Sequence, residues 1–137
     1  MRAYLSIKYE GDDNEETVQS LCTAAERAGF LVSCTNRDFD DFGRNDRDPE
    51  ELMPFMQDAI EQADVLLLDL TDKGVGLGVE AGYGAALGKP IVALAHEDAE
   101  IPTTIEALAR RVIRYQGFDD LTEQLGSVKR TLGKEAV

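Results

Sequence analysis

The residues with the clearest chemical potential lie between Ala63 and Leu94, in the run ADVLLLDLTDKGVGLGVEAGYGAALGKPIVAL. This run predicts a buried strand, a glycine-rich turn, a helix that carries Glu80, and a second buried strand. Glycines at positions 74, 76 and 78 allow the backbone to turn sharply and to approach a ligand closely. Glu80 is expected in the first turn of the helix, where free N–H groups and the helix dipole favour a carboxylate. Open α/β folds bind their ligands at this carboxyl edge of the sheet.

An acid at the start of a helix is common without any function, so the glycines around Glu80 decide between the two interpretations. Gly76, Gly78, Gly82 and Gly84 are costly in or near a helix unless something must come close to the backbone. They therefore favour a functional Glu80. The turn lacks the GxxxxGK[ST] pattern and departs from GxGxxG, which makes triphosphate and dinucleotide sites weak hypotheses.

Other polar residues follow the predicted strands and are expected at the same edge. They are Tyr4, Ser6 and Lys8 on the first strand, Asn36, Arg37 and Asp38 after the second, Asp69 and Thr71 on the third, and His96 on the fourth. Each also has a structural explanation: Tyr4 in the core, Asp69 paired with a donor because a buried carboxylate is expensive, and His96 as an ordinary strand-end residue. Lys8, Arg37, Arg44 and Lys73 are candidate cations for a phosphate group.

The residue inventory leaves a carboxylate nucleophile as the most economical chemistry at this edge. The sequence shows no Ser-His-Asp arrangement, and one histidine with two scattered cysteines has no familiar zinc-site spacing, so no metal site is expected. Carboxylates act as nucleophiles at sugar anomeric carbons, where they stabilise a transition state that resembles an oxocarbenium ion.

The order of the predicted elements indicates a single α/β domain of the flavodoxin or Rossmann-like type over residues 1–137. Strands alternate with helices, which predicts a five-stranded parallel sheet of order 2-1-3-4-5 with helices on both faces. The strands are expected at 2–7, 30–34, 64–70, 91–96 and 111–115, and the helices at 15–29, 49–62, 77–87, 102–109 and 118–132. Residues 36–48 are expected to form a long loop over the sheet edge. Asp48 and Pro49 predict an N-cap and a first helical position.

Composition limits the partners. With 14 basic and 27 acidic residues the formal net charge is −13, which repels phosphate backbones and disfavours nucleic acid as a partner. A small anion remains compatible, because a few cations and a helix N-terminus can hold one phosphate. No apolar run is long enough to predict a membrane span. Cys22 and Cys34 are expected to be buried, reduced thiols, which indicates a cytoplasmic protein.

The run GLGVEAGYGAALGKPIVAL, together with ADVLLLDLT before it and an aromatic residue in the first strand AYLSI, resembles the nucleoside 2-deoxyribosyltransferase superfamily. The GxGxE form with no acid in the preceding loop is more similar to the 2'-deoxynucleoside 5'-monophosphate N-hydrolase branch than to the transferases. The order of elements agrees over most of the chain, but the specific motif covers only residues 63–94.

The resemblance implies roles for individual residues. Glu80 would be the nucleophile and Tyr4 would assist it, while Ser6 and Lys8 are the nearest equivalents of the branch's phosphate contacts. We expect Asp69, Gly76, Gly78, Gly82 and His96 to complete the substrate-binding edge. Family members also have a base-handling aspartate eight residues before the aspartate that opens the third strand, here Asp64; that position is Met56. Asp58 is the substitute candidate, although on an ideal helix it points about 200° away from Met56.

These residues predict cleavage or transfer of an N-glycosidic bond in a nucleoside or nucleoside 5'-monophosphate, with no metal or organic cofactor. By the same resemblance we expect a homodimer. The alternative is a non-catalytic nucleotide-binding or sensing module, which Met56 favours. A third hypothesis, cleavage of NAD or of a cytokinin-type phosphoriboside, is disfavoured because the chain lacks a PGGxGT turn.

Overall fold

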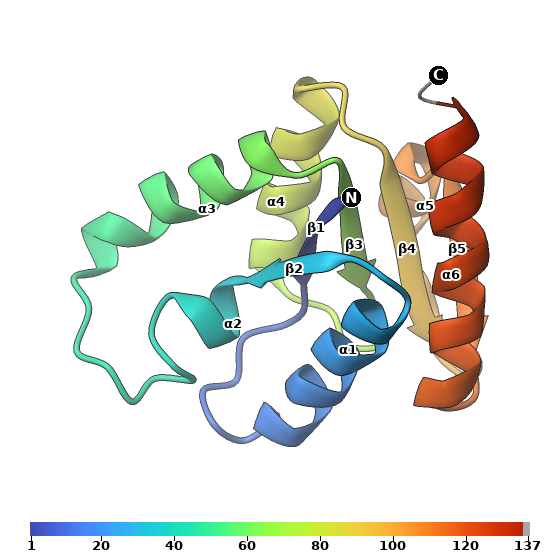
Figure 1. Cartoon of the computed structure of the whole chain (residues 1–137). Helices are drawn as coiled ribbons and strands as arrows, with labels where there is room; N and C mark the ends of the chain where they lie inside the picture. Colours follow the sequence, from blue (N-terminus) through green and yellow to red (C-terminus); the bar gives the residue numbers. More distant parts are fainter. Residues whose placement is uncertain (136–137) are drawn as a thin grey trace.

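A computed structural model describes residues 1–135 of the chain (Figure 1). Five parallel strands form one sheet in the order β2-β1-β3-β4-β5, which confirms the predicted α/β architecture. The strands are β1 (Arg2–Ser6), β2 (Leu31–Cys34), β3 (Val65–Asp69), β4 (Ile91–His96) and β5 (Arg111–Tyr115). The helices are α1 (Glu15–Arg27), α2 (Thr35–Asp38), α3 (Leu52–Gln62), α4 (Val75–Ala86), α5 (Thr103–Leu108) and α6 (Phe118–Glu135), with a 3-10 turn, η1, at Pro49–Glu51.

Helices cover both faces of the sheet. Because successive side chains of a strand point to opposite faces, each strand contributes residues to both core layers. Leu5 and Leu67 belong to the core layer under α1 and α6. Tyr4 and Leu66, each one residue earlier in its strand, belong to the layer under α3, α4 and α5. Figure 1 shows α3 and α4 together on one side of the sheet and α1 and α6 on the other.

The position of β1 between β2 and β3 creates the crevice in which this fold can hold a ligand. After β1 the chain passes to α1 on one face, and after β3 it passes to α4 on the other face. Neighbouring connections that leave the sheet in opposite directions open a gap above the carboxyl ends of the strands. Ser6, the last residue of β1, lies in register with Leu68 of β3 at this edge.

Two predicted elements differ from the structure. Residues 36–48 were expected to be a loop, but α2 occupies 35–38, and the turn after it is held by the side chain of Phe42, which is 2% exposed. The helix expected from about residue 77 begins at Val75, since Gly76 and Gly78 are helical and do not belong to the turn. Glu80 is therefore in the second turn of α4, and the first-turn placement was wrong.

The N-cap signal at Asp48 is confirmed. Its carboxylate accepts a hydrogen bond of 3.0 Å from the backbone N–H of Glu50, and Pro49 follows at the first position of η1. Cys22 and Cys34 are both buried and free, as the sequence predicts.

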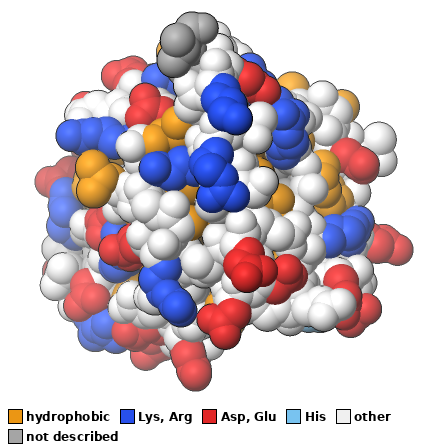
Figure 2. All heavy atoms as spheres, turned by 45° about the vertical axis from the view of Figure 1, so that its right-hand side comes forward, with side chains coloured by type: hydrophobic (Ala, Val, Ile, Leu, Met, Phe, Trp, Pro, Cys, Tyr) orange, Lys and Arg blue, Asp and Glu red, His pale blue; other side chains and the backbone are white. Residues whose placement is uncertain are grey.

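The face formed by α6 and its neighbours carries both signs of charge (Figure 2). Arg110 and Arg111 both pair with Glu135, at 3.1 and 3.2 Å. In residues 1–135, none of the helices combines the length and the apolar character needed to cross a membrane.

Candidate active site

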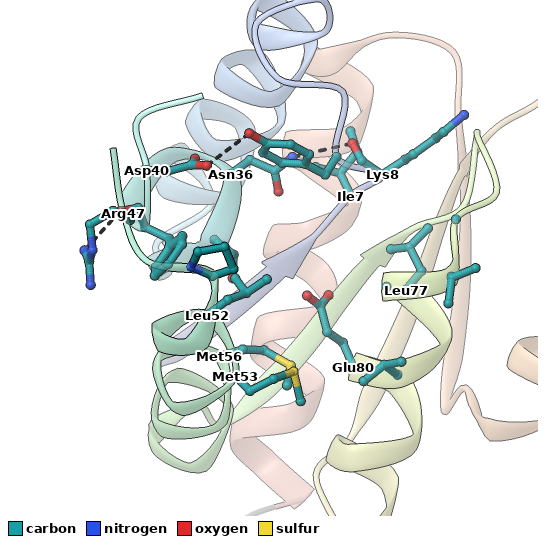
Figure 3. A pocket seen from close by; sticks show the side chains of 18 residues that line it. Ile7, Lys8, Asn36, Asp40, Arg47, Leu52, Met53, Met56, Leu77 and Glu80 are labelled. Carbon is teal, nitrogen blue, oxygen red and sulfur yellow. Dashed lines mark hydrogen bonds between the residues drawn. The ribbon is translucent and has the colours of Figure 1, made fainter. Parts of the chain in front are cut away.

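A pocket of about 550 Å³ opens at the carboxyl edge of β1 and β3, within the size range of small-molecule sites (Figure 3). Four segments form its walls: the end of β1, the segment around α2, the helix α3, and the first turns of α4. The lining residues are Ile7, Lys8, Tyr9, Thr35, Asn36, Phe39, Asp40, Arg47, Pro49, Leu52, Met53, Met56, Gly74, Val75, Gly76, Leu77, Val79 and Glu80. The lining is mostly apolar, so the few polar groups decide what the pocket can hold.

Close packing of α4 on the sheet brings Glu80 to this pocket. Gly84 follows Glu80 by one helical turn and therefore lies on the same side of the helix. A Cβ atom on Gly84 would come within 2.4 Å of Cδ2 of Leu66 in β3. The missing side chain thus lets the helix approach the strand, and the carboxylate of Glu80 reaches the hydroxyl groups of β1.

Two hydroxyl groups from alternate positions of β1 hold the Glu80 carboxylate. The Tyr4 hydroxyl donates to Oε1 over 3.0 Å, and the Ser6 hydroxyl donates to Oε2. The Tyr4 oxygen is also hydrogen-bonded to the hydroxyl of Thr35, the first residue of α2. Tyr4 is fully buried. The sequence thus placed Tyr4, Ser6 and Glu80 at one edge, and the structure brings them into direct contact.

Burial shifts the proton equilibrium of Glu80. Loss of water around the carboxylate raises its pKa to about 7, and the hydrogen bond from Tyr4 acts in the opposite direction. Burial, followed by the charge of Glu80, raises the pKa of Tyr4, so this hydroxyl remains a donor. A carboxylate that is half-protonated near neutral pH, faces a pocket and is fixed by two donors is suited to nucleophilic or acid–base chemistry.

The start of α4 forms the polar end of the pocket. Gly74 is the N-cap residue, and no side chain caps the free N–H groups of the first turn. The side chain of Lys8 runs beside Gly74, with its Cγ 3.3 Å from the Cβ position of that glycine. Its ammonium group lies 3.8 Å from Glu10 and points away from Glu80 (Figure 3). A cation and free backbone donors at one end suit an anionic substituent.

The α3 wall of the pocket is apolar and excludes Asp58. Met56 is 2% exposed and lines the pocket, with Met53 one turn earlier. Asp58 is exposed, accepts a hydrogen bond of 2.9 Å from Gln62 and borders a separate hollow beside β2. The helix is regular here, so Asp58 points away from Glu80 as the helical period predicts. The expectation that Asp58 replaces the missing acid is therefore not supported.

Asp69 and His96 form a second cluster that does not line the pocket. Asp69 is buried and accepts hydrogen bonds from the Tyr115 hydroxyl at 2.6 Å and from the Thr71 N–H at 3.0 Å. Burial raises its pKa, and these donors oppose the shift. The His96 ring packs edge-on against Tyr115, and its backbone N–H donates to Thr71. Both residues hold the ends of β3, β4 and β5 together.

Only one of the three glycines expected to contact substrate lines the pocket. Gly76 does so, whereas Gly78 and Gly82 do not. A Cβ on any of the three would meet no atom within 4 Å. The close approach of the helix to Leu66 thus explains why residue 84 is a glycine. Nothing in the structure explains why residues 78 and 82 are glycines.

Sequence reasoning missed several lining residues: Thr35, Phe39, Asp40 and Arg47. Asp40 accepts from the Tyr9 hydroxyl at 3.0 Å and from the Gly43 N–H at 3.1 Å. Arg47 stacks on Phe39, with its guanidinium carbon 4.5 Å from the ring centre. Their only sequence signal was their position just after a strand's carboxyl end, in the segment expected to be a loop.

The other candidate cations are engaged elsewhere or lie outside the pocket. Arg37 pairs with Asp38 and Glu26, and Arg44 pairs with Glu15 and Asp41. Neither they nor Lys73 line the pocket. Within residues 1–135, no three His, Cys, Asp or Glu side chains gather in a way that could hold a metal ion.

Comparison with known proteins supports the resemblance. No protein-family model matches the chain. A Thermofilum pendens protein with the provisional name 2'-deoxynucleoside 5'-phosphate N-hydrolase 1 is 29% identical over 138 residues, which cover 93% of this chain and 94% of that protein. The resemblance to the nucleoside 2-deoxyribosyltransferase superfamily is confirmed. Within that superfamily, the similarity is to the 2'-deoxynucleoside 5'-monophosphate N-hydrolase branch.

Two solved structures have a fold similar to that of this chain. One is the CMP N-glycosidase of Clostridium botulinum, which is 21% identical with a TM-score of 0.62 and aligns over 91% of this chain and 98% of that one. The other is a 2-deoxyribosyltransferase of Bacillus psychrosaccharolyticus, which is 14% identical with a TM-score of 0.72. The alignment covers 91% of this chain and 96% of that one.

Proposed function

We propose that this chain is an N-glycosidase or deoxyribosyltransferase that acts on a nucleoside or nucleoside 5'-monophosphate. The observation that carries the proposal is the carboxylate of Glu80, which two hydroxyl groups of β1 fix at the wall of a pocket of about 550 Å³. The full-length similarity to a protein named as a 2'-deoxynucleoside 5'-phosphate N-hydrolase supports the same reaction class.

In the first step a Glu80 oxygen attacks C1' of the sugar. The C1'–O bond forms while the C1'–N bond breaks, and the electron pair of the broken bond leaves with the base. The base then takes a proton from solvent, because the α3 wall offers Met56 and Met53 rather than an acid. Tyr4 donates to the attacking carboxylate, which keeps Glu80 oriented and lowers its pKa.

In the second step the sugar ester is released. Water attacks C1', the bond to Glu80 breaks, and the glutamate returns as a carboxylate. The proton of that water balances the one taken up by the base, so the sum is nucleoside plus water giving base plus free sugar. A second base that attacks C1' in place of water would complete a transfer reaction.

A 5'-phosphate would lie at the start of α4. Free N–H groups of the first turn and the ammonium group of Lys8 are the positively polarised groups at that end of the pocket. The sugar would then lie over Glu80, and the base would extend towards α3 and the segment around α2.

The competing proposal is a nucleotide sensor that binds without cleavage. Met56 supports it, because the base-handling acid of the superfamily has no replacement on α3. Binding would then be saturable while no base is released.

The deciding experiment measures free base from a panel of ribo- and deoxyribonucleosides and their 5'-monophosphates, with and without an acceptor base. We expect release from at least one substrate and none after Glu80→Gln. Asp58→Asn is the matched control, since that carboxylate lies outside the pocket. Mass analysis of protein treated with a 2-fluoro sugar substrate would identify the esterified residue. Binding of substrates without any release would favour the sensor.

We also propose that the chain forms a homodimer across the rim of this pocket. Leu52, Met53, Val75 and Val79 are 38–88% exposed around its mouth, and exposed apolar groups that gather at one place mark interaction surfaces. Light scattering should give twice the chain mass, and Val75→Asp should lower it.

A further inference from the structure

The part of the pocket that would receive the base contains one carboxylate other than Glu80. The ionisable side chains of the lining are Lys8, Tyr9, Asp40, Arg47 and Glu80. Lys8 lies at the start of α4, and Arg47 stacks on Phe39 and pairs with Glu51. Asp40 therefore remains as the charged group able to contact a base at the end of the pocket away from Lys8 (Figure 3).

Asp40 is fixed in place before any ligand binds. The Tyr9 hydroxyl donates to Oδ2 at 3.0 Å, and the Gly43 N–H donates to Oδ1 at 3.1 Å. The turn that supplies Gly43 is unusual, because Asp41, Phe42 and Gly43 all have φ between 49° and 87°. Phe42 anchors this turn in the core. Each carboxylate oxygen accepts one hydrogen bond and keeps lone-pair capacity for another.

Apolar and aromatic side chains of the lining suit a flat aromatic ring. Met53 and Met56 line one side, and Tyr9 and Phe39 contribute rings from the other segments. Asn36 lies beside Asp40 and is 4% exposed, with its amide donating to the backbone oxygen of Lys8 at 3.4 Å. The pocket thus offers apolar side chains for the faces of a ring, and polar groups at Asn36 and Asp40 for its edge.

We propose that Asp40 selects bases with an exocyclic amino group, such as cytosine or adenine, over their oxo counterparts. This inference rests on the proposed function, because it assumes that the sugar lies over Glu80. An ionised carboxylate only accepts hydrogen bonds, so an amino group pairs with it, whereas a carbonyl oxygen at the same position meets a like partial charge. Tyr9 is the positioning residue that orients Asp40.

The test compares substrates that differ only in whether the base carries an amino group or a carbonyl oxygen. One pair is cytidine 5'-monophosphate and uridine 5'-monophosphate, and the other is adenosine 5'-monophosphate and inosine 5'-monophosphate. We expect kcat/KM to favour the amino member by about 10-fold or more. Asp40→Asn should reverse the ratio, because an amide can donate to a carbonyl. Tyr9→Phe should reduce the ratio without reversing it. Asp46→Asn, on the same segment but outside the pocket, should leave it unchanged.

Binding to the Glu80→Gln variant separates this inference from the proposed reaction. Calorimetry should show that cytidine 5'-monophosphate binds more tightly than uridine 5'-monophosphate. Adding Asp40→Asn to the Glu80→Gln variant should reverse this order. Equal affinities, or no binding of either nucleotide, would overturn the selection by Asp40 even if the wild-type protein releases base. If cytidine 5'-monophosphate binds more tightly than uridine 5'-monophosphate but no base is released from any substrate, base selection by Asp40 is supported and the proposed glycosidase reaction is contradicted. Circular dichroism of each variant checks that the fold is kept.

Discussion

Tyr4 in β1 and Glu80 in α4 are joined by a hydrogen bond of 3.0 Å, although they are 76 residues apart in the chain. The bond crosses from β1, which lies between β2 and β3 in the sheet, to a helix packed on the face of that sheet. It therefore depends on the crevice at which the connections after β1 and β3 leave the sheet on opposite faces.

Tyr4→Phe should slow base release by about 10-fold, since one hydrogen bond to a charged group is lost. The loss should be larger at low pH, because the Tyr4 bond lowers the pKa of Glu80 and its removal lets that pKa rise. Rate profiles against pH for both proteins measure this change. Tyr83→Phe is the control, since Tyr83 lies on the same helix but bonds to Glu61. An unchanged profile for Tyr4→Phe would contradict the role given to the hydroxyl.

The rate of base release should rise with pH to a plateau, with a midpoint at about pH 7. The proposed nucleophile is the ionised form of Glu80, and burial raises the pKa of this carboxyl group to about 7. Below the midpoint the rate should fall tenfold for each pH unit. A rate that stays constant down to pH 5 would exclude Glu80 as the titrating nucleophile.

Glu80 should also make stability depend on pH. An unfolded glutamate has a pKa of about 4.3, so between that value and about 7 the folded chain holds more protons than the unfolded chain. The free energy of unfolding contributed by Glu80 therefore falls as pH rises through this window and is constant above it. Denaturant titrations at a series of pH values give the free energy of unfolding of the wild type and of Glu80→Gln. The dependence of this free energy on pH should differ between the two proteins only within the window.

Gly84→Ala should destabilise the protein by about 1–3 kcal/mol, because the new Cβ would lie 2.4 Å from a methyl group of Leu66. The displaced helix should also weaken the contact of Glu80 with Tyr4 and reduce activity. Gly82→Ala is a matched control on the same helix. Its Cβ meets no atom within 4 Å, so alanine should stabilise by about 0.5–1 kcal/mol. Urea unfolding measures both, and equal effects would contradict the packing argument.

Tyr115→Phe should lower the free energy of unfolding by about 1–3 kcal/mol while base release is preserved. The change removes the 2.6 Å donor from the buried carboxylate of Asp69. Neither residue lines the pocket. Parallel urea and activity measurements test both halves, and a selective loss of activity would show that this cluster takes part in the reaction.

Sequence patterns of short range predict the fold of this protein and the position of Glu80 at the pocket. The apolar run of β3, the glycine stops and the alternation of strands with helices predict the sheet order, because parallel strands need crossover helices. The GxGxE motif identifies Glu80, and the first strand identifies Tyr4 and Ser6. These signals depend on neighbours in the chain, which a sequence displays directly.

The tertiary structure alone decided which other residues share the pocket. Asp58, Asp69 and His96 have suitable chemistry but point elsewhere, because a helical period and the pairing of strand ends set their directions. Asp40 and Arg47 line the pocket from the segment after α2, in which Phe42 is buried in the core. Contacts between segments far apart in the chain depend on packing, and packing leaves no periodic mark in a single sequence.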